Sequence, residues 1–332
     1  MRKVLIYILA FVLLCFLIPI IFTKRPEKAV VAINEVSKEN ENNQNGNKTD
    51  TKTPTIVKLL HSETGEVEEL EMDKYLYGVV SAEMPANFEK EALKAQAIVA
   101  RTYTEYKIYK GSKHENADIC DDSKCCQAWI SKEKRFEKWN EVDRENNWNK
   151  ITSAVDETSG KIITYDGAPI NAFFHSNSGG TTETVANVWG GSNYPYLQSV
   201  ETSGEDSYTQ YASTVTLSKE EVLQKMQAEY PETTIDWTQE KPIQITEYNE
   251  SGRVKTIQIG NKSISGVEAR TIFGLKSAKF NVQVGESVQF DVVGYGHGVG
   301  LSQTGADAMA KTGATAEQII NHYYTGVKIE NI

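Results

Sequence analysis

The sequence is short of positive charge. Its 332 residues contain 35 Lys and Arg against 45 Asp and Glu, which gives a formal net charge of −10 at pH 7. Five of the basic side chains lie within residues 1–28, which contain a single acidic one, so the remainder is more acidic still. A chain of this charge is a poor candidate for binding nucleic acid or an anionic cell-wall polymer. A neutral sugar chain suits it better.

Cysteine is also scarce. Of four cysteines, Cys15 lies in an apolar run and Cys120, Cys125 and Cys126 lie within seven residues of one another. One interpretation is a Cys120–Cys126 disulfide with Cys125 free. The other, which we favour, is a structural zinc ion held by His114 and the three thiolates, because a Cys3His set is typical of such sites. Four protein ligands would leave no position for a reactive water.

The sequence has one long apolar run, Val4–Phe22, whose 19 residues approach the length that spans a bilayer. A signal peptide would be followed by a cleavage site of small residues, and no such site follows this run. We therefore expect residues 1–23 to form a transmembrane anchor. Residues 24–55, dominated by Asn, Lys, Glu and Thr, are expected to form a disordered tether. Residues 56–332 then form the folded ectodomain.

The folded part shows no internal repeat and no alternation of strands with helices, which favours the α+β class. Short alternating segments around turn residues predict hairpins, and apolar residues at helical spacing predict helices. The expected hairpins are 56–72 and 161–174, the expected helices 73–83, 88–110, 214–230 and one opened by Thr315, and the expected strands 243–259 and 287–294.

Glu83 is the candidate catalytic residue. It continues a helical stripe formed by Leu76, Val79 and Val80, and Pro85 then ends the helix. A carboxyl group shielded by its own apolar stripe should have a raised pKa, which suits proton donation near neutral pH. The alternative is an ordinary solvated carboxylate at a helix end.

Two polar segments could line a ligand groove. One runs from His175 to Glu183 directly after a predicted strand, and Trp189 follows it. The other is the glycine-rich segment from Gly294 to Ala306. No Gly-Lys-Ser/Thr follows its glycines and no strand–helix dinucleotide unit surrounds them, so nucleotide binding is excluded. For the first segment, the alternatives are a simple turn and a buried structural histidine.

The stretch Gly78–Tyr103 resembles the signature of the stage II sporulation protein D family, in which Ala-Glu-Met-Pro precedes a Glu-Ala-Leu-Lys-Ala-Gln-Ala…Ala-Arg-Thr-Tyr helix. The other two segments resemble the family's His-Ser-x-Ser-Gly-Gly-x-Thr and Gly-His-Gly-x-Gly-x-Ser-Gln-x-Gly-Ala motifs. The resemblance is weakest at Gly204–Asn261, and we expect about 204–290 to form a more variable, strand-rich subdomain. Cys125 stands where a His is common in the family.

The resemblance implies a peptidoglycan lytic transglycosylase, a lyase of the cell wall that acts during engulfment in sporulation. Glu83 would be its only acid/base, and the glycan strands would be stripped of stem peptides and end in 1,6-anhydro sugars. It also implies a single-pass membrane protein with a cytoplasmic N-terminus and its ectodomain between mother cell and forespore. The partners would be the membrane-bound stage II sporulation proteins P and M, with no nucleic acid and no catalytic cofactor.

The resemblance further implies that one groove binds the glycan. Its expected substrate-binding residues are Gln96, Arg101, Tyr103, His175, Ser176, Ser178, Gly179, Gly180, Thr181, Trp189, His297, Ser302 and Gln303.

Three other functions stay open at this point. They are a zinc-dependent amidase or peptidase, a non-catalytic wall-binding scaffold, and an ordinary two-carboxylate glycosidase with Glu183 as the second acid.

Overall fold

The structure is a computed structural model that describes residues 55–192 and 194–332. Within them, helices are mixed with several small sheets and no large sheet dominates, so the α+β class is confirmed. The predicted anchor at 1–23 and all of the predicted tether at 24–55 except Thr55 lie outside the described residues.

The predicted single-pass localisation in the cell membrane, with a cytoplasmic N-terminus, needs correction. In the described part of the chain, no helix combines the length and the apolar character needed to cross a bilayer. The structure therefore does not support that localisation.

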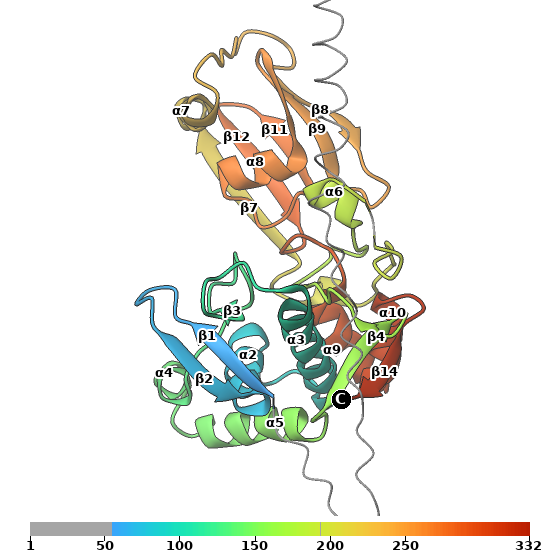
Figure 1. The fold of residues 1–332 in the computed structure, drawn as a ribbon. Coiled ribbons are helices and arrows are strands. Elements are labelled where there is room, and N and C mark those ends of the chain that lie inside the picture. The colour runs from blue at the N-terminus through green and yellow to red at the C-terminus, as the bar shows by residue number, and fades with distance from the viewer. Residues whose placement is uncertain (1–54, 193) are drawn as a thin grey trace, which may run out of the picture. The chain divides into compact units, whose positions relative to one another are not determined.

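A hairpin and two helices begin the described chain (Figure 1). The two strands of the hairpin pair antiparallel, and a later two-residue strand, β3, pairs parallel with the first of them. The hairpin and both helices are confirmed to within two residues. The elements up to residue 189 are β1 (Ile56–Leu60), β2 (Val67–Glu71), α2 (Met72–Glu83), α3 (Lys90–Lys110), β3 (Ile119–Cys120), α4 (Lys132–Lys138), α5 (Arg144–Asp156), β4 (Lys161–Tyr165), β5 (Ala168–Pro169), β6 (Phe174–His175) and α6 (Val185–Trp189).

Helix α3 is the centre of the larger hydrophobic core. It packs against α2, α5 and β4, and the C-terminal helices α9 (Gln303–Lys311) and α10 (Ala316–Tyr323) cover it from another side. One of its faces is fully buried, as Ala92, Ala95 and Val99 each have 0% of their surface exposed. This core fixes the C-terminal end of α2, where Glu83 lies.

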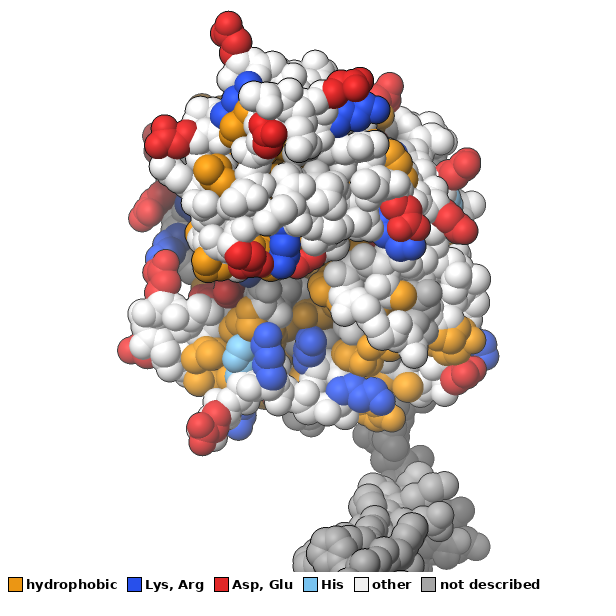
Figure 2. All heavy atoms as spheres, turned by 90° about the horizontal axis from the view of Figure 1, so that it is seen from above, with side chains coloured by type: hydrophobic (Ala, Val, Ile, Leu, Met, Phe, Trp, Pro, Cys, Tyr) orange, Lys and Arg blue, Asp and Glu red, His pale blue; other side chains and the backbone are white. Residues whose placement is uncertain are grey.

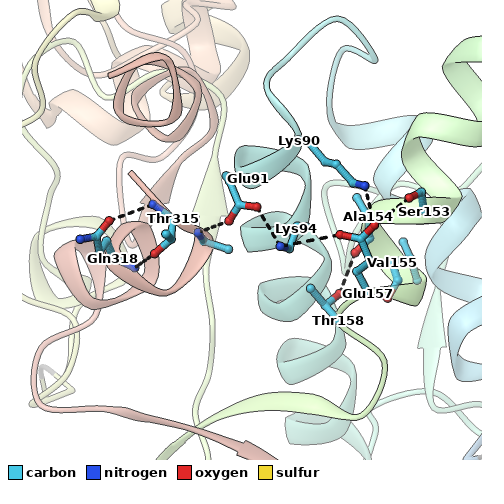
Figure 3. A network of polar contacts seen from close by, with 11 residues as sticks. Lys90, Glu91, Lys94, Ser153, Ala154, Val155, Glu157, Thr158, Thr315 and Gln318 are labelled. Carbon is cyan, nitrogen blue, oxygen red and sulfur yellow. Dashed lines mark hydrogen bonds and ion pairs between the residues drawn. The ribbon is translucent and has the colours of Figure 1, made fainter. Parts of the chain in front are cut away.

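Polar contacts tie the start of α3 to two neighbouring helices (Figure 3). Glu91 accepts hydrogen bonds from Lys94, at 2.8 Å, and from the backbone amide of Ala316 in α10, at 2.7 Å. Lys90 and Lys94 both form ion pairs with Glu157 at the end of α5. These partly exposed pairs add little stability individually, but they link three helices at this end of the core.

A second core lies between residues 215 and 292. Two three-stranded antiparallel sheets and two helices enclose it, in the upper part of Figure 1. Its elements are β7 (Ala212–Ser218), α7 (Lys219–Glu229), β8 (Ile243–Tyr248), β9 (Val254–Ile259), β10 (Lys262–Ser265), α8 (Gly266–Phe273), β11 (Phe280–Val284) and β12 (Ser287–Val293).

The helix predicted at 214–230 is wrong in its first part. Residues 212–218 form strand β7, whose alternating Thr, Val and Leu side chains pair with β12. The helix begins only after Ser218, which forms a capping box with Glu221. The β-branched residues before it fit a pleated strand better than a helix.

The C-terminal elements bring the two predicted polar segments together. Strand β13 (Leu301–Ser302) pairs parallel with β6, so that Leu301 lies opposite Phe174 and Ser302 opposite His175. Helix α10 begins after Thr315, as predicted, and Thr315 forms a capping box with Gln318; β14 (Lys328–Asn331) pairs with β4. A short 3-10 helix, η1 (Glu205–Ser207), lies beside α9.

Acidic side chains are spread over the face shown in Figure 2, with Lys and Arg side chains between them. In the lower half of this view, Lys and Arg side chains gather beside a hollow, with acidic side chains mainly toward the edges.

Candidate functional site

A groove of about 660 Å³ opens beside Glu83. Its walls come from the connection between α2 and α3, from the α4–α5 region, and from the two glycine-containing segments that β6 and β13 bring together. The lining residues are Ala82, Glu83, Met84, Pro85, Ala86, Asn87, Phe88, Arg135, Trp139, Asp143, Asn147, Ser176, Gln210, Tyr295, Gln303 and Thr304.

Glu83 is the last residue of α2, and its carboxyl group reaches the groove. Its oxygen Oε1 accepts a hydrogen bond of 2.6 Å from the backbone amide of Ala128. Burial raises the pKa of the Glu83 carboxyl above its usual range, while the Ala128 amide and the Gln303 side chain act in the opposite direction. The side-chain amide nitrogen of Gln303 has no hydrogen bond of good geometry to the described residues. The contact between Gln303 and Glu83 is therefore weak. A partly shielded carboxyl group of raised pKa can hold a proton and give it away.

The segment that carries Ala128 is fixed from both sides. Gln127 is buried, and its side-chain amide donates to the hydroxyls of Tyr75, at 2.8 Å, and Thr104, at 3.0 Å. Trp129 packs so closely on α2 that a Cβ atom at Gly78 would lie 2.2 Å from its ring nitrogen. The Ala128 amide is therefore held in place before any ligand arrives.

The four predicted metal ligands lie directly before this segment. Their ligand atoms all lie within 4.8 Å of one another, and the three thiols form no disulfide. The sulfur atoms of Cys125 and Cys126 are 3.7 Å apart, and Nε2 of His114 lies 3.5 Å and 3.4 Å from them. Ligands on a tetrahedral zinc would be separated by about 3.8 Å (S to S) and about 3.5 Å (N to S), given the usual bond lengths. The spacing of His114, Cys125 and Cys126 fits that ion, and the Cys120 sulfur lies within 4.8 Å of each of them.

A buried carboxylate, Glu205 in η1, joins the two polar segments. It accepts hydrogen bonds from the amides of Ser178 and Gly180, at 3.0 and 2.9 Å, and from several hydroxyls, among them those of Ser178 and Ser302. These donors lower the pKa of Glu205 to about 2, although burial opposes them. The carboxylate therefore stays ionised and holds the segment before α6 against the start of α9. Nothing in the local sequence around Glu205 indicated this role.

Comparison with known proteins shows the family of the chain. A family model described as "Stage II sporulation protein" matches residues 61–165. The chain is 36% identical to a stage II sporulation protein D of Bacillus amyloliquefaciens over 83% of its own length and 79% of the relative's. It is 34% identical to the protein of the same name of Bacillus subtilis, over 91% and 85%. The chain belongs to the stage II sporulation protein D family.

A protein named "Amidase enhancer", from Bacillus subtilis, is also similar to this stage II sporulation protein D family member. It is 29% identical over 76% of this chain, but only 40% of its own length is covered.

Only three of the predicted site residues of this family member line the groove: Glu83, Ser176 and Gln303. Arg101 is 1% exposed, and its guanidinium pairs with Asp73 at 2.8 Å and donates to the carbonyl of Thr158 at 2.7 Å. Asp73 thus pairs with this arginine and makes no side-chain cap for α2. The positions of Gln96 and Tyr103 are also buried in the α3 core. A substrate contact by Gln96, Arg101 or Tyr103 stays a prediction.

The predicted residues His175, Trp189 and His297 form an aromatic cluster. The rings of Trp189 and His297 are 5.0 Å apart, and those of the two histidines 5.6 Å. His175 is buried, and burial lowers its pKa to about 4; His297 is shifted in the same direction for the same reason. Both histidines are therefore neutral near pH 7. Trp189 is 52% exposed, so a sugar could still stack on it.

The remaining predicted residues hold the loops together. Ser178 and Ser302 bond to Glu205, and the amide of Gly179 bonds to its neighbour Asn177. The carbonyl groups of Gly179 and Thr181 accept hydrogen bonds from Lys279 and Arg253.

Glu183 does not line the groove. It is 2% exposed and accepts hydrogen bonds from Asn187, Asn249 and Ser251 at 2.6–3.1 Å. The carboxylate that shares the groove with Glu83 is Asp143. The sequence analysis did not predict that Asp143 lines the groove. It did not predict Arg135, Trp139 or Asn147 either, because the α4–α5 region contains no recognisable motif.

Proposed function

We propose that this protein is a lytic transglycosylase that cuts peptidoglycan strands between N-acetylmuramic acid and N-acetylglucosamine during engulfment. The observation that carries the proposal is Glu83, a carboxyl group with a raised pKa at the wall of a groove large enough for sugar rings. Membership of the stage II sporulation protein D family supports a role in sporulation. The groove at Glu83 is the proposed glycan-binding groove.

In the proposed reaction, protonated Glu83 gives its proton to the glycosidic oxygen as the bond to C1 of N-acetylmuramic acid breaks. An oxocarbenium-like state forms at C1. The 6-hydroxyl of the same sugar then attacks C1, and its proton passes to the Glu83 carboxylate. The products are a 1,6-anhydro end and a new 4-hydroxyl end, and no water is consumed. The Ala128 amide stabilises the carboxylate between the two proton transfers.

We propose further that His114, Cys120, Cys125 and Cys126 hold one structural zinc ion. The spacing of their ligand atoms supports this, and four protein ligands leave no open position. Such an ion would fix the segment that ends at Ala128 and would take no part in the reaction itself.

Stripped glycan strands are the proposed substrate, and the stage II sporulation proteins P and M stay the proposed protein partners. A non-catalytic role is the second candidate, since the similar protein named "Amidase enhancer" carries a name that describes help to another enzyme. A zinc-dependent amidase or peptidase is disfavoured by the closed ligand set.

One experiment separates these functions. The full chain is incubated with glycan strands, with intact peptidoglycan, and with either substrate plus a chelator. A transglycosylase shortens the glycan strands. An amidase or peptidase releases peptides and leaves glycan strands uncut, and brief chelation silences it. A scaffold releases nothing from either substrate, and that result would overturn the proposal.

A further inference from the structure

The wall of the groove formed by the α4–α5 region carries an arginine that pairs with no carboxylate among the described residues. Arg135 lies on the short helix α4, which begins after Ser131, and its guanidinium lies 4.7 Å above the ring of Trp139. Both side chains line the same groove as Glu83. The α4–α5 region was not part of any motif, so its contribution to the site comes from the fold alone.

Arg135 pairs with no described carboxylate. Its Nε is buried and has no hydrogen-bond partner among the described residues. Burial is the cause that lowers its pKa, yet an arginine stays charged at neutral pH. By contrast, Arg101 pairs with Asp73 at 2.8 Å and the neighbouring Arg144 pairs with Glu141 at 3.4 Å. A half-buried cation without an ion pair raises the free energy of the folded protein, because it has lost part of its hydration. A bound anion would offset that loss.

The geometry selects a planar anion. A guanidinium that lies over an aromatic ring with its Nε buried can still donate from its two Nη atoms, and their spacing matches the two oxygens of a carboxylate. Hydroxyl and N-acetyl groups of the glycan are neutral. In a strand that has lost its stem peptides, the one anionic group is the lactyl carboxylate of each N-acetylmuramic acid, so such a strand is anionic and differs from the neutral sugar chain expected from the net charge of −10. While a stem peptide is attached, that carboxylate is an uncharged amide.

We propose that Arg135 binds the lactyl carboxylate of an N-acetylmuramic acid in a stripped strand. This inference rests on the proposed function, because it places that glycan in this groove. Lactyl groups occur on every second sugar, so one ion pair fixes the register of the strand. Arg135 thereby determines which of the two alternating linkages reaches Glu83, and it favours strands without stem peptides.

Binding tests this without any need for turnover. The full chain carrying Glu83→Gln is titrated with three probes: stripped strands, the same strands with their lactyl carboxylates converted to methylamides, and an N-acetylglucosamine oligomer that has no lactyl groups. Arg135→Gln is then added, with Arg144→Gln as the matched control, since Arg144 is a nearby arginine that does not line the groove. Thermal unfolding checks that each variant is folded.

Arg135→Gln should weaken binding of stripped strands roughly 10- to 100-fold, the usual size of a charge-assisted hydrogen-bond pair. Conversion to methylamides should weaken binding by the unsubstituted protein equally, and should weaken the Arg135→Gln protein no further. Binding of the N-acetylglucosamine oligomer should change less than about twofold. Arg135→Lys, which keeps the charge but loses the planar edge, should give an intermediate affinity.

Equal losses for all three probes would show that Arg135 only shapes the groove through Trp139, and no loss for stripped strands would show that the carboxylate binds elsewhere. Either result overturns the inference. The transglycosylase proposal is judged separately, by whether the protein with an intact Glu83 cuts strands at all.

Discussion

Two glutamates, Glu83 and Glu205, have opposite surroundings in this protein. Glu83 ends a helix at the wall of a groove, accepts one strong hydrogen bond from a backbone amide, and has a raised pKa. Glu205 is 1% exposed, accepts hydrogen bonds from amides and hydroxyls of two loops, and has its pKa lowered to about 2. The first holds its proton more tightly than an ordinary glutamate does, whereas the second stays ionised at neutral pH.

Burial alone does not determine the direction in which the pKa of a carboxyl group shifts. Burial raises the pKa of both residues, and the number of donors around each decides the outcome. Glu205 is surrounded by enough donors to overcome burial, so its charge builds structure. Glu83 has few, so burial dominates and its pKa is raised.

The largest effect is expected from replacing Glu83 by Gln, which tests whether turnover needs the proton of this carboxyl group. The amide keeps the shape of the side chain but has no proton to transfer, so turnover of stripped strands should fall at least ~10²-fold. The free energy of unfolding at pH 7 should not fall, because burial disfavours the charged form of Glu83. The exposed Glu89, mutated to Gln, is the matched control and should retain full turnover. Near-normal turnover of Glu83→Gln would remove Glu83 from the mechanism.

The comparison also depends on the segment that presents Ala128 to Glu83. We expect purified protein to contain about one zinc per chain, and we expect Cys125→Ser or removal of the metal to lower the melting temperature strongly, since structural zinc contributes directly to folding. Turnover should fall with it, because the Ala128 amide loses its fixed position. Metal analysis with calorimetry measures both effects. A Cys120–Cys126 disulfide without metal, found by mass spectrometry, would contradict this prediction.

Glu205→Gln should lower the free energy of unfolding, because it removes the buried charge that holds the two loops together. The folded-state pKa of Glu205 lies below its unfolded value, so its stabilisation is present above about pH 4.5 and is lost as the pH falls toward about 2. The pKa difference corresponds to roughly 3 kcal/mol at neutral pH. Denaturant unfolding at pH 7 should show a loss of this order, and the acid dependence should flatten. The exposed Asp206 in the same short helix, mutated to Asn, should show neither change.

The smallest expected effect concerns Gln303. Its side chain helps to lower the pKa of Glu83, so Gln303→Leu should raise that pKa and move the alkaline limb of the pH–kcat profile to higher pH. The shift should be under about one pH unit, because the contact is loose. A shift toward lower pH would show that Gln303 acts on Glu83 in another way.

The features that were predicted correctly from the sequence are those set by a local pattern of residues, such as the ends of helices. The apolar stripe before Pro85 located Glu83, and the Thr315–Gln318 capping box located the start of α10. It did not predict Glu205, Arg135 or Asp143, because their roles depend on contacts between segments far apart in the chain. Ser302 looked like a ligand contact within a motif, yet its hydroxyl bonds to Glu205, a partner 97 residues away.

The central claim is that Glu83 acts alone and that the sugar's own 6-hydroxyl is the nucleophile. Its most direct test is digestion of stripped strands in water enriched in oxygen-18, followed by mass spectrometry of the new ends. If Glu83 acts alone, the new strand ends should be 1,6-anhydro sugars, each lighter by one water than a hydrolysis product and without oxygen-18. Reducing ends that carry oxygen-18 as the primary product would contradict it and would indicate a two-carboxylate hydrolase, with Asp143 in the same groove as the first residue to replace.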